Sequence, residues 1–403
     1  MKVLIYSEYF LPVVGGVQTS VRLLARGLAE LNAREKLSDR ESIHVTVATR
    51  TIANGFDDSS LPYRVVRRPG FRQLFQLVRE ADVIHLAGPC LLPMAMAWLM
   101  RKPVVIEHHG YQAICPNGLL FLQPLQTACS GHFMERRYGA CVRCCSGAMG
   151  WAGSVRSLLL TFPRRWLCKR AAANVTITNH VGKRLMLPRS RTIYYGIETA
   201  SKPDNDSAVS ESPNLEVAYI GRLVAEKGLP LLLDAVKVLS TEGVAFHLTF
   251  IGDGPERTRL ESLVDHLDLR RAVAFTGDLR DSGLERAVSK IAVVVMPSVW
   301  EETAGLSAIE HMMRGRLVVS ADIGGLGEVV GDAGLKFAVG DSAMLASRLR
   351  QAAQNRQEIT NLGSVARKRA ETLFSVDRMV SEHSLLYREL SAADQSPAGC
   401  SKA

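Results

Sequence analysis

The sequence lacks an apolar run long enough to cross a membrane. Its most apolar stretch, 86–100, contains one glycine and two prolines and is shorter than the roughly 18–20 residues of a transmembrane helix. A secretory signal is not expected either, because Glu8 interrupts the apolar N-terminal run. With 47% hydrophobic and 22% charged residues, the composition excludes collagen, coiled coil and wholesale disorder. A folded cytoplasmic protein is therefore expected.

Acidic residues are scarce in the first half of the chain. Residues 1–200 carry 26 lysines and arginines against 12 aspartates and glutamates, whereas the remainder carries 23 against 28. A basic half suggests an anionic partner, such as lipid headgroups, nucleic acid or a phosphorylated substrate. An ordinary solvated basic surface is the alternative.

Short apolar runs alternate with helical patterns along nearly the whole chain. The strands expected in the first half are 2–7, 44–49, 82–87, 103–108, 174–179 and 192–196. Those expected in the second half are 216–221, 247–252, 272–277, 292–298 and 317–320. Apolar strands separated by helices are typical of parallel βαβ units covered on both faces. The fold class is therefore α/β.

A polar segment rich in serine, aspartate and proline, 201–214, separates the two series of strands and is expected to be a linker. The predicted domains are 1–200 and 215–374, both Rossmann-like. A last helix is expected at 375–390, and the tail at 391–403 is expected to be disordered.

Glycines and cations stand where expected strands end. Gly16 follows a glycine before a helix, so the backbone there can approach an anion; a simple tight turn is the alternative. No G-x-G-x-x-G follows the first strand, which argues against a nicotinamide dehydrogenase. In GRLVAEKG, Arg222 and Lys227 leave a strand end, where they suit a diphosphate. Two surface cations are the alternative reading.

The segment MPSVWEETAGLSAIEHMMRG predicts a strand, a loop and a helix in succession. The amides of Gly305, Leu306 and Ser307 would form a helix N-terminus able to hold a phosphate. Glu302 would stand in the loop beside a transferred group, and Glu310 would accept hydrogen bonds from ribose hydroxyls.

Taken in order, these motifs resemble glycosyltransferase family 4, a family of retaining enzymes with the GT-B fold. The resemblance extends from Met1 to about residue 390 and rests on PVVGGVQ, GRLVAEKG, FIGDGPERTRLESL, the E-x7-E pair, SADIGGLGEVVGDAGL and FSVDRMVSEHSLLYREL. It implies two Rossmann-like domains facing across a cleft, with the last helix crossing back onto the first domain.

The resemblance also implies roles for the matching residues. Those that would bind the nucleotide-sugar donor are Gly16, Arg222, Lys227, Gly305, Leu306, Ser307 and Glu310. The catalytic candidates beside the donor sugar are Glu302 and His109, of which the histidine has a purely structural reading as the alternative. The residues that depart from the family's usual pattern are Ala304, His311, Leu317 and Gly327. We therefore expect a donor-sugar pocket of different shape.

By the same resemblance, the reaction transfers a sugar from a UDP- or GDP-sugar to a hydroxyl of a sugar or lipid-linked acceptor. No cofactor would be required and nucleic acid would not be a partner. The expected setting is the synthesis of a cell-surface polysaccharide or glycolipid. The alternatives are a relative with other chemistry, such as a nucleotide-sugar epimerase or a phosphorylase, and a non-catalytic nucleotide-sugar-binding protein.

Five of the eight cysteines crowd into the 31 residues from 115 to 145. Cys141 and Cys144 have metal-ligand spacing, and Cys115 and Cys129 would complete a four-thiolate zinc site. Ordinary reduced thiols are the alternative.

The segment RSLLLTFPRRWLCKR, 156–170, mixes cations with leucine, phenylalanine and tryptophan. It would suit an anionic membrane surface, on the inner face of the cytoplasmic membrane, where a lipid-linked acceptor is found. A surface helix with a basic face is the alternative.

Overall fold

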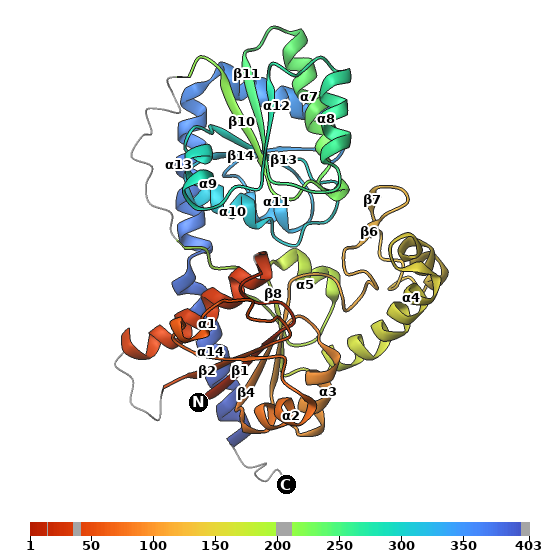
Figure 1. Ribbon diagram of the computed structural model, residues 1–403, viewed down its shortest axis with the longest axis vertical. Coiled ribbons are helices and arrows are strands. Elements are labelled where there is room, and N and C mark those ends of the chain that lie inside the picture. The colour runs from red at the N-terminus through yellow and green to blue at the C-terminus, as the bar shows by residue number, and fades with distance from the viewer. Residues whose placement is uncertain (14, 35–41, 199–211, 396–403) are drawn as a thin grey trace, which may run out of the picture. The chain divides into compact units, whose positions relative to one another are not determined.

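The computed structural model describes residues 1–13, 15–34, 42–198 and 212–395, and its chain divides into two compact units (Figure 1). The first unit comprises Met1–Leu119, Gly131–Glu198 and Phe374–Ala403; the second comprises Leu120–Ser130 and Thr199–Leu373. Most of the predicted linker, as far as residue 211, and residues 396–403 of the predicted tail lie outside the described residues. The prediction of disorder is wrong for residues 391–395, which form the end of the last helix.

A seven-stranded sheet of order β3-β2-β1-β4-β5-β8-β9, parallel throughout, forms the centre of the first unit. Its strands are β1 (Lys2–Ser7), β2 (His44–Thr49), β3 (Arg64–Arg67), β4 (Val83–Ala87), β5 (Val104–His108), β8 (Ala173–Thr176) and β9 (Ser190–Thr192). Its helices are α1 (Gly16–Arg34), α2 (Phe71–Glu80), α3 (Leu91–Leu99), α4 (Tyr138–Cys168), α5 (Asn179–Leu185) and α14 (Val376–Gln395), with a short 3₁₀ turn η1 (Asp58–Ser60).

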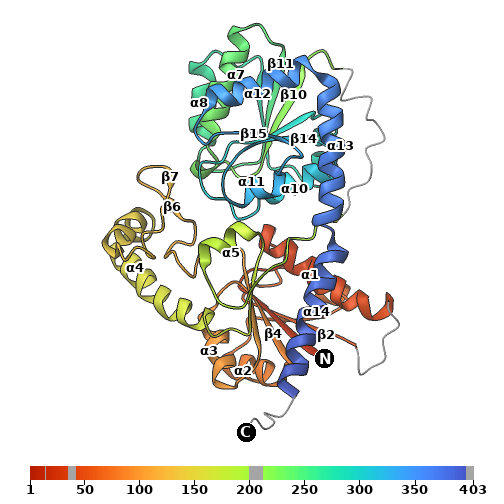
Figure 2. The same ribbon diagram turned by 180° about the vertical axis from the view of Figure 1, so that it is seen from behind.

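The C-terminal helix α14 belongs to the first unit and lies along α1 (Figure 2). Val380, His383 and Tyr387 recur at helical spacing and are all buried there. Gly27 of α1 leaves room for this packing, because a Cβ at that position would collide with the Val380 side chain. The last helix is therefore a component of the first core, although it follows the whole second unit in the sequence.

The second unit has its own parallel sheet, with strand order β12-β11-β10-β13-β14-β15. Its strands are β10 (Leu215–Ile220), β11 (Phe246–Ile251), β12 (Val273–Gly277), β13 (Val293–Met296), β14 (Leu317–Ala321) and β15 (Leu335–Phe337). Its helices are η2 (Ala225–Lys227), α7 (Leu229–Thr241), α8 (Arg257–His266), α9 (Asp281–Ser289), α10 (Leu306–Met313), α11 (Gly324–Val330), α12 (Ser342–Gln354) and α13 (Arg356–Leu373). Figures 1 and 2 show α7 and α8 on one side of this sheet and α13 on the other. The segment grouped with this unit from the first half holds the small hairpin β6 (Phe121–Leu122) and β7 (Thr127–Ala128).

The α/β prediction is confirmed, but two expected strands are wrong in extent, and β3, β15 and the hairpin β6–β7 were not predicted. The strand expected at 174–179 ends at Thr176, because the Thr178 hydroxyl caps α5 by accepting a hydrogen bond from the Val181 amide. The strand expected at 192–196 is instead Ser190–Thr192. The chain then leaves the sheet, and Gly196 packs closely against Met379 at the start of α14.

Within the described ranges, the helices do not combine the length and apolar composition that crossing a bilayer requires.

Candidate functional site

The residues predicted to bind a nucleotide sugar in the second unit gather where its central strands end. Arg222 follows β10, and Glu302 follows β13 by a six-residue step. The Ser307 hydroxyl in the first turn of α10 donates to the Ile220 carbonyl at the end of β10, at 3.0 Å. Because β10 and β13 are neighbours in the sheet, these loops lie at one edge of it.

Lys227 and Glu302 form a largely buried ion pair at this edge. Lys227 Nζ donates to Glu302 Oε1 at 2.7 Å, and the same carboxylate oxygen accepts a hydrogen bond from the Ser298 hydroxyl. The two side chains are 17% and 4% exposed. The Lys227 ammonium also lies 5.8 Å from the centre of the Trp300 ring. The ion pair therefore holds one carboxylate oxygen of Glu302 in place and keeps the Lys227 ammonium beside the loop that follows β13.

The backbone around α10 requires glycine. Gly305 caps the helix with φ +78, and a Cβ there would lie 2.7 Å from the Leu326 side chain. Gly324 has φ +60 and begins the next helix, α11. A Cβ at this position would lie 2.6 Å from the Glu302 carbonyl. The N-terminal amides of α10, at Leu306 and Ser307, are thereby held beside Glu302, as an anion-binding helix terminus requires.

Glu310 and Arg222 are charged residues of the second unit whose side chains are available to a ligand. Glu310 lies half-buried in α10, where burial raises the pKa of its carboxyl, opposed by Arg314. Among the described residues, its carboxylate accepts no hydrogen bond, so it can receive hydroxyl donors. The Arg222 side chain is 76% exposed and reaches only to within 4.0 Å of Glu226.

In the first unit, His109 follows β5 directly and is held by two side chains. Its Nδ1 lies 2.6 Å from the Tyr195 hydroxyl, and the two rings stack at 5.6 Å with an angle of 6°. Its Nε2 lies 3.4 Å from Glu107 Oε2. Burial lowers the pKa of His109 in opposition to the Glu107 charge, so a largely neutral imidazole is expected near neutral pH.

Glu107 is a buried carboxylate that the sequence analysis missed. Burial would raise the pKa of its carboxyl, but His109 and His85 overcome this effect and hold the pKa at about 2. His85 Nε2 lies 3.2 Å from Glu107 Oε2, and His85 Nδ1 lies 2.8 Å from the Tyr387 hydroxyl on α14. The available signal was one acidic residue inside an otherwise apolar strand, VVIEHH, which is unusual for a central parallel strand.

His108, the neighbour of His109, has a different environment. Its Nε2 lies 2.9 Å from Asn174 Oδ1, and burial lowers its pKa to about 4. Successive residues of a strand face opposite sides of the sheet. His109 therefore lines the cavity and His108 belongs to the core.

A cavity of about 810 Å³ opens at the carboxyl ends of β1, β4 and β5 in the first unit. His109 lines it, as do Val17 and Gln18, which follow the predicted donor residue Gly16 at the start of α1. Its charged lining residues are Glu8, Arg50, Arg68, Arg156 and Arg164. An excess of arginines makes it suited to an anionic or strongly polar ligand.

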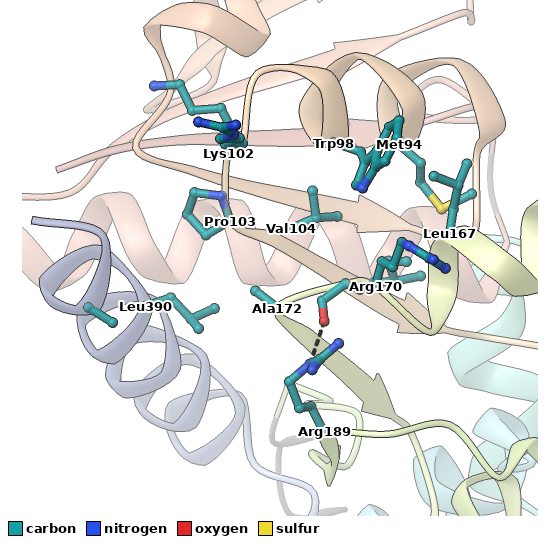
Figure 3. Close-up of a pocket in the computed structure, with 14 residues that line it drawn as sticks. Met94, Trp98, Lys102, Pro103, Val104, Leu167, Arg170, Ala172, Arg189 and Leu390 are labelled. Carbon is teal, nitrogen blue, oxygen red and sulfur yellow. Dashed lines mark hydrogen bonds between the residues drawn. The ribbon is translucent and has the colours of Figure 1, made fainter. Parts of the chain in front are cut away.

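A second cavity, of about 510 Å³, lies in the first unit at the amino ends of β5 and β8 (Figure 3). Trp98, Met94, Leu167 and Leu390 give it apolar walls. The cationic residues that line it are Arg101, Lys102, Arg170 and Arg189. No acidic residue is among its described lining residues. Because ligands of parallel sheets bind at the carboxyl ends of the strands, we do not assign the reaction to this cavity.

A buried group of two histidines and a glutamate in the described part of the chain has the composition of a metal site. His85, Glu107 and His383 offer ligand atoms that lie within 4.8 Å of one another. Each already has a protein partner, since His383 Nδ1 lies 2.9 Å from the Met379 carbonyl and the other two face each other. We therefore interpret the group as the network that supports His109.

Comparison with known families identifies both halves of the chain. Residues 14–201 match the model described as Glycosyltransferase Family 4, and residues 202–369 match the model described as Glycosyl transferases group 1. The two matches adjoin, and together they include every predicted site residue.

The individual relatives match a smaller part of the chain. The chain is 30% identical over 198 residues to 2-deoxystreptamine glucosyltransferase of Streptomyces kanamyceticus, covering 45% of this chain and 51% of that protein. It is 34% identical over 160 residues to the sulfoquinovosyl transferase SQD2 of Arabidopsis thaliana, covering 38% of this chain and 30% of that protein. The chain thus matches about half or less of these relatives' length.

Among solved structures, HepE of Anabaena in complex with UDP superposes with a TM-score of 0.71 at 18% identity, covering 96% of this chain and 100% of that one. This similarity establishes the fold as GT-B.

Proposed function

Because the chain belongs to glycosyltransferase family 4, we propose that it transfers a sugar from a nucleoside diphosphate sugar to a hydroxyl acceptor. The observation that carries this proposal is the buried Lys227–Glu302 pair beside the N-terminus of α10. It places a cation, a carboxylate and free backbone amides at the edge of one parallel sheet, where nucleotides bind.

Each part of the donor has a matching group in the second unit. The diphosphate meets Arg222, Lys227 and the amides of Leu306 and Ser307, whose charges oppose the negative charge that develops as the phosphate leaves. The unpartnered carboxylate of Glu310 accepts the ribose hydroxyls. Glu302 faces the transferred sugar.

We propose retention of configuration, with Glu302 as a positioning group rather than an attacking nucleophile. Its Oε1 accepts hydrogen bonds from Lys227 and Ser298, which stabilises the carboxylate and lowers its nucleophilicity. The bond from the anomeric carbon to the phosphate oxygen breaks, and the acceptor oxygen bonds to the same carbon. The acceptor proton passes to the departing phosphate.

Donor binding is tested first, by thermal stabilisation of the full chain against UDP-, GDP- and ADP-sugars. UDP-glucose is the first choice because the Anabaena neighbour HepE has been solved with it. One donor is expected to raise the melting temperature. Glu310→Ala and Lys227→Ala are expected to abolish that shift, and Glu371→Gln on α13 is the control. A donor shift that survives in both variants would place the nucleotide elsewhere.

Turnover distinguishes a transferase from the alternatives. Release of the free nucleoside diphosphate that depends on an added acceptor supports transfer, and NMR of the product's anomeric proton reports retention. Conversion of the donor sugar without diphosphate release would indicate an epimerase instead. Donor binding with neither reaction would favour a non-catalytic binding protein.

We assign the acceptor to the cavity lined by His109 in the first unit, where the arginines favour an acceptor that carries a phosphate or another anion. A lipid-linked acceptor would also explain the exposed apolar stripe on α4, formed by Trp151, Val155, Leu159, Phe162 and Trp166. Their spacing of three or four residues places them on one face of the helix. Their exposed fractions lie between 41% and 64%.

The apolar stripe ends beside the cationic cavity of Figure 3. The rings of Trp98 and Trp166 meet edge to face at 5.1 Å, and the Arg170 guanidinium lies 3.6 Å above the Trp166 ring. Aromatic and aliphatic side chains flanked by arginines suit the headgroup region of an anionic bilayer. We therefore propose peripheral attachment to the cytoplasmic face of a membrane, in glycolipid or polysaccharide synthesis.

Co-sedimentation with vesicles tests this attachment. Binding to phosphatidylcholine vesicles that contain phosphatidylglycerol is expected, with weaker binding to pure phosphatidylcholine and at high salt. The double variant Trp151→Ser/Leu159→Ser is expected to lose binding, whereas Leu385→Ser, equally exposed on α14, retains it. Equal sedimentation of all three proteins would contradict the proposal.

A further inference from the structure

We propose that the cysteines between residues 115 and 145 bind one structural zinc ion, with Cys115, Cys141 and Cys144 as thiolate ligands. These three cysteines belong to the first unit, and the proposal is independent of the proposed transfer reaction. Cys141 and Cys144 come from the first turns of α4, and Cys115 comes from the loop after β5.

The helix places its cysteines on one face. Cys141, Cys144 and Cys145 have spacings of three and four residues, which bring side chains together along an α-helix. Cys141 and Cys145 are buried, with 6% and 2% exposure, and Cys144 is half-buried. All three are thiols in the structure rather than disulfides.

The loop after β5 brings Cys115 to the same place. The Cys115 thiol donates to Asn117 Oδ1 at 2.9 Å, and Asn117 Nδ2 points at the Cys144 sulfur at 4.0 Å. One short amide thus spans the two sulfurs. The loop is also anchored to α4, because the Ser157 hydroxyl donates to the Pro116 carbonyl at 2.7 Å.

The thiols of the cluster are close neighbours. Cys144, Cys115 and Cys141 all lie within electrostatic range of the Cys145 thiol. Thiolates this close together repel one another, whereas a bound zinc ion reverses that effect and deprotonates its ligands. Thiolate ligands favour zinc among the common divalent ions, and structural zinc sites hold them in a tetrahedron.

A structural zinc site takes four ligands. The fourth thiolate comes from one of the two remaining cysteines of this stretch, Cys129 or Cys145. The sequence prediction assigns Cys129. In the structure, Cys145 lies within electrostatic range of the other three thiols, so single variants of both residues are needed to decide.

Metal analysis of the full chain tests the proposal directly. Protein purified without chelator is expected to contain about one zinc per chain, and the cobalt-loaded form is expected to show thiolate-to-metal absorption of a tetrahedral site. Cys115→Ser, Cys141→Ser and Cys144→Ser are each expected to lose most of the metal. Cys168→Ser is the matched control, because Cys168 is a buried cysteine at the far end of α4, beyond the non-helical Gly150 and outside the cluster.

Among Cys129→Ser and Cys145→Ser, one variant is expected to lose zinc, which names the fourth ligand. Should the variants fail to fold, mercurial titration of the wild-type chain provides the second test, since modification of the cluster is expected to release the metal stoichiometrically. A metal-free wild-type chain that takes up neither zinc nor cobalt would overturn the proposal, as would a disulfide within the cluster or zinc retained in all the variants. Donor binding serves as an independent readout of the second unit.

Discussion

Lys227 Nζ and Glu302 Oε1 lie 2.7 Å apart, joining two loops whose residues are 75 positions apart in the chain. Neither loop has a regular structure of its own beyond a short turn at Ala225–Lys227. The ion pair therefore does two things at once: it joins the two loops, and it orients the carboxylate that we propose to face the transferred sugar.

Lys227→Ala is expected to cost stability as well as donor binding. The substitution leaves the Glu302 carboxylate, 3% exposed, without its cation, which typically costs about 3 kcal/mol for a buried pair. Urea unfolding measures this loss. Lys290→Ala, at an exposed position after α9, should change the unfolding free energy by less than about 0.5 kcal/mol. Equal stability of the two variants would mean that the pair adds nothing to the fold.

Tyr195→Phe should reduce turnover while leaving donor binding nearly unchanged. The substitution keeps the ring that stacks on His109 but removes the hydroxyl at Nδ1. Losing one hydrogen bond that orients a side chain corresponds to about a tenfold fall in kcat. Steady-state kinetics provide the measurement, with Tyr194→Phe as the neighbouring control. A change confined to KM would show that His109 contributes to binding only.

The unfolding free energy is expected to fall as the pH drops below about 6.5. Burial lowers the pKa of His108 and His383 to about 4 and that of His311 to about 3. In the unfolded chain these groups take up protons near pH 6.5, so acid favours unfolding. Each contributes at most about 1.4 kcal/mol per pH unit between the two pKa values.

His311→Ala should therefore flatten the dependence of the unfolding free energy on pH between about 4 and 6.5. The comparison is between slopes, so the cavity left by the smaller side chain does not affect it. An unchanged slope in His311→Ala would show that the histidine is not held neutral.

Gly228→Ala and Gly340→Ala separate steric cost from backbone cost. Both glycines have positive φ, of +64 and +79, but a Cβ at Gly228 would collide with the Pro297 carbonyl, whereas open space surrounds Gly340. Gly340→Ala should lose about 1–2 kcal/mol of unfolding free energy. Gly228→Ala should lose clearly more and also weaken donor binding, because Lys227 precedes it. Equal losses of unfolding free energy would mean that the loop after β13 shifts to make room for the methyl group.

Much of the site in the second unit was predictable because its residues follow strand ends. The apolar runs predicted five of the six strands of this sheet to within two residues, but not β15, and parallel strands bring their carboxyl ends to one edge. Arg222, Lys227 and Glu302 could therefore be placed together without coordinates. The hydrogen bonds between these residues could not be predicted, because they depend on loop conformations set by Gly228 and Gly324.

The sequence by itself determined the parallel sheets and the family and supplied the proposed donor residues, because hydrophobic periodicity and short motifs are encoded by neighbouring residues. Only the tertiary structure decided that Glu107, His85 and Tyr387 form one network, linking residues up to 302 positions apart. The return of the last helix to the first domain was expected from the resemblance, but only the structure identified the side chains of α14 that complete the core and the exposed face of α4. Such contacts depend on which surfaces pack together in three dimensions, and local sequence patterns do not specify that packing.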